Sequence, residues 1–147
     1  TELYCPNNEL TEVDLGNNTA LGQLTVTNNQ LKELDISKDT ALTYLACANN
    51  QLKELNVSKN TALTELSCSY NQLTELNVNN NTALTRIDCG SNQLSKLDVS
   101  KNTALTYLSC GSNEGNKLTK LDVSIKINFS FPVVGISNKE PNSGQPT

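Results

Sequence analysis

The chain has 147 residues, a net charge of −4, no His, Met or Trp, and only two Phe, which leaves little aromatic material for a bulky globular core. The acidic balance gives no electrostatic reason to expect nucleic acid or an anionic membrane as a partner. No apolar stretch reaches the roughly 18 residues that cross a bilayer, so we expect no membrane insertion.

A repeat of 21 residues organises most of the chain. Residues 42–62 read LTYLACANNQLKELNVSKNTA, and residues 63–83 read LTELSCSYNQLTELNVNNNTA. Each repeat has two halves of the form LxxLxLxxN, and their alternating apolar residues have the period of a β-strand. One coil cannot bury its own apolar edge, whereas stacked coils share a core. We therefore predict a leucine-rich-repeat solenoid of about six coils over residues 1–124. It is mostly β, with a parallel sheet on its concave face and with turns, 3-10 segments or a second strand on the far side.

An Asn stands at one position of every repeat, where the chain turns away from the predicted strand. Backbone groups at such a turn would be buried without partners, and a carboxamide can both donate to them and accept from them. Stacked copies would form an internal ladder of hydrogen bonds. The predicted ladder residues are Asn8, Asn29, Asn50, Asn71, Asn92 and Asn113.

A cysteine column has the same period, and Val26 replaces the cysteine in one repeat. The spacing matches neither a CxxC metal pair nor a small disulfide scaffold. A soft metal is one alternative, and parallel side chains on neighbouring coils have poor geometry for a disulfide. We interpret the column as buried, reduced thiols that pack as small apolar groups. Its members are Cys5, Cys47, Cys68, Cys89 and Cys110.

The repeat is interrupted once, between Ser112 and Leu118, and it stops after Val123. Residues 125–136 alternate apolar and polar side chains and contain both Phe, which is typical of a strand. Because the last coil of a repeat array exposes its apolar face, we predict that this segment is a capping strand. We interpret the polar residues 137–147 as a tail or a linker.

With both columns in place, the motif LTxLxCxxNQLxxLDVSxNTA resembles the nested 21-residue leucine-rich repeats of bacterial surface proteins. Within that group it is most similar to the internalin J type, whose repeats carry a ladder of unpaired cysteines. The resemblance covers about residues 3–124. It implies a curved, right-handed solenoid of the α/β leucine-rich-repeat class, a secreted or cell-surface location, and a role in adhesion or host interaction.

No set of residues suited to catalysis is visible. The chain lacks His and a GxSxG motif, and inward cysteines without a neighbouring base are poor nucleophiles. We therefore predict no enzyme activity and no cofactor.

A column of Asp and Asn on the second half of the repeat could attract Ca²⁺, which takes six to eight oxygen ligands. Asn interrupts the row, nearby Lys residues screen it, and no Gly-x-Asp calcium-turn spacing is present. We interpret it as a solvated face and predict no metal. The column is Asp14, Asp35, Asn56, Asn77, Asp98 and Asp122, and the screening residues are Lys32, Lys53, Lys96 and Lys120.

Surface positions vary between repeats in the first half and recur almost unchanged in the second. Most of the Tyr residues and the only Arg fall at the variable positions, and Tyr and Arg are the residue types most often found as interface hot spots. The alternative is a solvated sheet whose aromatics reflect strand propensity. We predict a binding strip on the concave face, made of Tyr4, Gln23, Tyr44, Glu65, Tyr70, Arg86, Asp88 and Tyr107.

The sequence therefore predicts a monomeric, non-enzymatic recognition module of a secreted or cell-surface bacterial protein. It would bind a protein or glycan, such as one on host cells, through the concave strand face. The alternative is a structural spacer that presents another domain.

Overall fold

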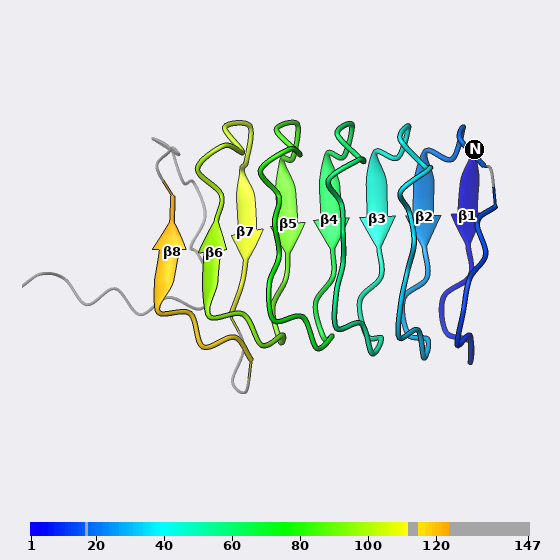
Figure 1. Ribbon diagram of the computed structural model, residues 1–147, viewed down its shortest axis with the longest axis horizontal. Coiled ribbons are helices and arrows are strands. Elements are labelled where there is room, and N and C mark those ends of the chain that lie inside the picture. The colour runs from blue at the N-terminus through cyan, green and yellow to red at the C-terminus, as the bar shows by residue number, and fades with distance from the viewer. Residues whose placement is uncertain (17, 112–114, 124–147) are drawn as a thin grey trace, which may run out of the picture.

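The computed structural model describes residues 1–16, 18–111 and 115–123. Over these ranges the chain winds into a right-handed solenoid, in which each coil passes along one face and returns along the other (Figure 1). The parallel β-solenoid predicted from the repeat is confirmed, and the described ranges contain no helix. None of the described segments is therefore a helix long and apolar enough to span a bilayer.

One parallel sheet, here called sheet A, takes a three-residue strand from each of six successive coils. Neighbouring strands pair in register, so that Leu45 at the centre of one strand lies beside Leu66 in the next. The central residue points into the core and its two neighbours point outward, because successive side chains on a strand alternate. The strands are β1 (Glu2–Tyr4), β2 (Gln23–Thr25), β3 (Tyr44–Ala46), β4 (Glu65–Ser67), β5 (Arg86–Asp88) and β7 (Tyr107–Ser109).

The second halves of the repeats form the opposite side of the solenoid, here called the sheet-B face. Within the described ranges, strands form there only near the C-terminal end, where β6 (Lys96–Asp98) pairs in parallel with β8 (Lys120–Asp122). Each second half from the first coil to the fifth also has a local turn in which a backbone N–H binds an Asp or Asn side chain. In the second coil the N–H of Ser37 donates to Oδ1 of Asp35 at 2.9 Å. Of the three alternatives expected for the far side, a second strand is present at one end of the stack and turns are present in the other described coils.

Aliphatic side chains from both faces fill the space between them in one continuous core. Leu24, Leu45 and Val57 are among the fully buried side chains, and the same columns continue from coil to coil. The cysteine column lies inside this core: Cys47, Cys68, Cys89 and Cys110 are buried and unpaired. Cys5 is only partly buried, since it follows β1, the edge strand of sheet A.

The Asn column forms an internal ladder at the end of sheet A. Asn71 is typical: its Nδ2 donates to the backbone oxygens of Cys47, Cys68 and Ser69, and its Oδ1 accepts the N–H of Leu52 at 3.0 Å. Each buried Asn therefore links two consecutive coils as well as its own turn. Asn8, in the first coil, is exposed and donates only within that coil.

In the sixth coil the ladder position is occupied by Asn116. Its Nδ2 donates to the oxygens of Cys89 and Cys110, and its Oδ1 accepts the N–H of Leu94, each at 2.9 Å. These are the contacts that Asn92 makes one coil earlier. The extra residues of this coil thus precede the ladder Asn, and Asn113, which was predicted for the position, lies outside the described residues. The predicted capping strand 125–136 and tail 137–147 also lie outside them.

A second Asn ladder, which the sequence analysis did not assign, supports the turns before sheet A. Asn60, Asn81 and Asn102 are completely buried, and each Nδ2 donates to two backbone oxygens of the preceding coil. The same position of the second coil is occupied by Asp39, which is also buried. Burial, together with the charge of Asp35, raises the pKa of the Asp39 carboxyl. The turns that lead into sheet A, at residues 60–63, 81–84 and 102–105, are therefore held by the same type of bond as the turns after it.

Candidate binding face

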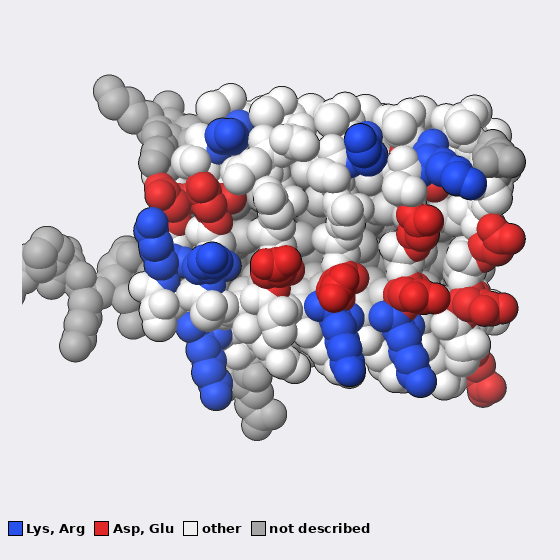
Figure 2. All heavy atoms as spheres, viewed as in Figure 1, with Lys and Arg blue, Asp and Glu red and all other residues white. Residues whose placement is uncertain are grey.

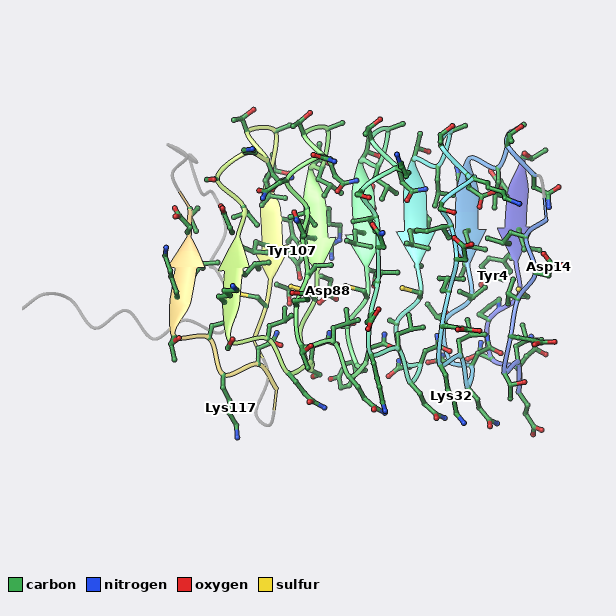
Figure 3. All side chains as sticks on the ribbon, in the orientation of Figure 1. Tyr4, Asp14, Lys32, Asp88, Tyr107 and Lys117 are labelled. Atoms are coloured by element: carbon green, nitrogen blue, oxygen red, sulfur yellow. The ribbon has the colours of Figure 1, made fainter. Side chains whose placement is uncertain are left out.

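Seven of the eight residues of the predicted binding strip lie at outward positions of sheet A, whereas Tyr70 lies in the turn that follows β4. Figure 3 places Tyr4 at one end of the sheet and Asp88 and Tyr107 towards the other. Tyr4 is 77% exposed, and the adjacent Leu3 is also exposed. Gln23 is exposed, whereas Tyr44, Glu65, Asp88 and Tyr107 are partly buried beside neighbouring coils. The strip is thus a row of solvent-accessible side chains on a sheet whose neighbouring strands pair in register between coils.

The structure brings five of the eight strip residues together over the last four strands of sheet A. The guanidinium carbon of Arg86 lies 3.6 Å from the centroid of the Tyr107 ring, a cation–π contact between β5 and β7. Next to it lies a hollow of about 210 Å³. The hollow is lined by Tyr44, Glu65, Leu66, Ser67, Arg86 and Asp88. Tyr4 and Gln23 do not line it.

Tyr70 has a backbone conformation that few bulky residues adopt. Its φ is +53°, in the left-handed region, and its side chain is 60% exposed. The same turn position holds Asn7, Asn28 and Asn49 in the preceding coils and Ser91 in the next. Asn tolerates this region because its short polar side chain can bond locally, whereas a residue such as Tyr is strained there. Backbone strain of this kind occurs most often at functional sites.

Replacing Tyr70 with Asn should stabilise the protein by about 1 kcal/mol, because the left-handed turn then carries a residue suited to it. Urea unfolding of the two proteins measures the difference. Tyr44→Asn is the matched control: it lies in a strand, where the same exchange should cost stability. A Tyr70→Asn variant with unchanged or lower stability would contradict the strain interpretation.

The buried thiols are unsuited to nucleophilic chemistry. Burial raises the pKa of Cys47 from 9.0 to about 12. Burial also raises the pKa values of Cys68 and Cys89, and the neighbouring thiols of the column add to both shifts. The thiolate is the reactive form, so these side chains stay protonated and inert at neutral pH. They behave as parts of the core.

The Asp and Asn column of the sheet-B face shows no arrangement suited to a metal. Figure 2 shows acidic and basic side chains distributed together over this face. Hydrogen bonds from Ser37 lower the pKa of Asp35, and those from Ser100 lower the pKa of Asp98, so both carboxylates already bind their own turns. In the described ranges no group of three or more His, Cys, Asp or Glu residues could hold an ion.

Sequence reasoning missed the contact of Arg86 with Tyr107 and the hollow above Ser67. The repeat contained a signal for both. Arg86 and Tyr107 are one period apart in the same column, so the register places them side by side. Ser67 is a small residue with larger side chains at the positions around it.

Solved structures of internalins have a fold similar to that of this chain. The functional domain of InlJ from Listeria monocytogenes, which includes a cysteine ladder, superimposes with a TM-score of 0.73 at 28% identity, over 86% of this chain and 35% of that one. The chain is an internalin-like leucine-rich-repeat solenoid. The internalin InlF from the same organism matches with a TM-score of 0.60 at 25% identity, over 71% of this chain and 35% of that one.

A leucine-rich-repeat protein from Leptospira interrogans shares the fold of the internalin-like solenoid, with a TM-score of 0.55 at 20% identity over 74% of this chain and 38% of that one. The internalin-like solenoid thus spans little more than a third of the length of these solved structures. No protein-family description matches it. No curated protein matches it either.

Proposed function

We propose that the chain is a recognition module of a secreted or cell-surface bacterial protein, and that it binds a macromolecule, in adhesion or host interaction, across the outward face of sheet A. A protein partner fits this surface best, and a glycan is the second candidate. The likeness to internalins supports the surface location and the extracellular role. The module would work as a monomer and without a cofactor.

The observation that carries this proposal is the position of the variable side chains. Tyr44, Arg86 and Tyr107 project from a sheet whose inward residues and ladder Asn residues are nearly constant. A rigid backbone orders few new groups on binding, which keeps the entropic cost of association low. Tyr and Arg supply large contact areas and directional hydrogen bonds on such a surface.

A double substitution tests the proposal. Tyr44→Ala with Arg86→Ala should lower attachment of the purified chain to host cells or matrix at least tenfold, because hot-spot truncations typically cost 2 kcal/mol or more. Both side chains point away from the core, so the circular-dichroism spectrum should show an intact fold, with only the modest loss of stability expected for truncating a strand Tyr. Lys53→Ala with Glu54→Ala, on the sheet-B face, is the control and should attach normally.

Attachment that is unchanged in the sheet-A variant would contradict binding through this face. It would favour the alternative in which the solenoid is a spacer that presents another domain. A loss of attachment in both variants would indicate contact through more than one face and would also contradict the proposal.

A further inference from the structure

Two carboxylates, Glu65 and Asp88, line the hollow on sheet A, and the basic side chain in its lining, Arg86, is directed toward Tyr107. Arg86 pairs in register with Glu65 on one side and with Tyr107 on the other. It lies over the Tyr107 ring, 3.6 Å from the ring centroid. The one ion pair within 4.0 Å found in the described ranges joins Lys120 to Asp122, on the opposite face. Glu65 and Asp88 therefore face the hollow without a cationic partner.

The other walls of the hollow suit a cation as well. Tyr44 lines one side, and an aromatic ring attracts a cation placed over its face. Ser67 is a small residue in the lining, which leaves room for an aliphatic chain beside the larger side chains. Oδ1 of Asp88 accepts only a long bond of 3.4 Å from the N–H of Gly90, so that carboxylate retains capacity for a stronger donor.

The size of the hollow restricts the ligand. Its volume of about 210 Å³ is below the range of roughly 300–1,000 Å³ that is typical of small-molecule sites. It is suited to one side chain of a partner protein. The two carboxylates exceed the one guanidinium beside them, so the chemistry of the walls selects a positively charged side chain over an acidic or a neutral one.

We propose that the hollow formed by Tyr44, Glu65 and Asp88 receives a single lysine or arginine side chain from a protein partner. The ammonium or guanidinium group binds the two carboxylates, and its alkyl stem lies along the Tyr44 ring. This rests on the proposed function of the sheet-A face, and it favours a protein over a glycan as the partner. Arg86, held on Tyr107, forms the wall opposite Tyr44 and keeps the carboxylates accessible.

A titration of the ¹⁵N-labelled full chain with N-acetyl-lysine methylamide tests the proposal by NMR. Shifts of backbone amides should be confined to residues 44–46, 65–67 and 86–88. Glu65→Gln with Asp88→Asn should weaken binding of this probe at least tenfold, and the added Asn keeps the acceptor for the Gly90 N–H. The norleucine analogue, which has the same stem without the ammonium group, should cause no comparable shifts.

The matched control is Glu33→Gln with Glu54→Gln, which removes two exposed carboxylates from the sheet-B face and should leave probe binding unchanged. Shifts that map to the sheet-B face, equal shifts with the norleucine analogue, or unchanged binding by the Glu65 and Asp88 variant would each overturn the proposal.

The failure of this proposal and the failure of the recognition function give different results. In one outcome, the probe binds in the hollow while substitution of Tyr44 and Arg86 leaves host attachment unchanged. That result would support the basic side-chain pocket and contradict recognition through this face. If attachment depends on Tyr44 and Arg86 while the probe does not bind, recognition stands and the basic side-chain pocket is wrong.

Discussion

Replacing Asn71 with Ala is expected to lower the free energy of unfolding by upward of about 3 kcal/mol. The carboxamide of Asn71 is the partner of the Leu52 N–H and of the Cys47 and Cys68 oxygens. Alanine leaves these groups buried without partners, and each unsatisfied buried group costs roughly 1–3 kcal/mol. The loss is a large share of the roughly 5–15 kcal/mol that stabilises a typical domain. Urea unfolding followed by circular dichroism measures it.

The chain provides a control for this substitution in the same column. Asn8 is exposed and donates only within the first coil, so Asn8→Ala should cost less than about 1 kcal/mol. Equal effects at the two positions would show that the contacts of Asn71 with the preceding coil do not hold the stack together.

Raising the pH from 8 to 10 should destabilise the protein by about 4 kcal/mol through Cys47, Cys68 and Cys89 alone. In the unfolded chain each thiol ionises near its ordinary pKa of 9.0, whereas in the folded chain Cys47 keeps its proton up to about 12. Cys68 and Cys89 are shifted in the same direction. The folded state then binds more protons than the unfolded state, so stability is fully present below pH 9 and falls as the pH rises towards 12. One pH unit above the unfolded pKa corresponds to about 1.4 kcal/mol per thiol.

Val26 supplies the control, because the second coil already places valine at this position and buries it completely. A variant with Val in place of Cys47, Cys68 and Cys89 keeps every other titrating group. Both proteins are unfolded in urea at each pH. Between pH 8 and 10, the free energy of unfolding of the variant should fall by about 4 kcal/mol less than that of the original protein. Parallel pH profiles of the two proteins would mean that the thiols do not ionise on unfolding.

The fold could be predicted from the repeat because each of its structural features returns in nearly every coil. The inward Leu residues, the cysteine column and the Asn ladder each depend on a local period, and stacking requires the periods to coincide. The second Asn ladder could have been found by the same reasoning, since Asn60, Asn81 and Asn102 end the second LxxLxLxxN motif. Asn116 was missed because its coil contains extra residues. The preserved spacing Asn-x-Leu, seen in Asn116 and Leu118 as in Asn92 and Leu94, marks the true register.

The binding strip was less predictable, because side-chain directions on a surface depend on neighbours rather than on a period. The sequence places Arg86 between Glu65 and Tyr107, and charge alone would have favoured Glu65. In the structure the Arg86 guanidinium lies over the Tyr107 ring instead, and the hollow lies beside this contact. The left-handed φ of Tyr70 was also not apparent from its type, and only the Asn residues at equivalent positions indicated it.

Because paired strands of sheet A are always 21 residues apart, the residues that hold the coils together can stay constant while the outward residues change. From the second coil to the fifth, strand pairs and ladder bonds join residues a fixed distance apart, and each coil uses the same donors and acceptors as the next. Gene segments that encode single coils can therefore be exchanged, duplicated or lost by recombination without a mismatch at the junctions. The outward residues travel with each segment, so new combinations of Tyr, Arg and Asp arise by shuffling as well as by point mutation.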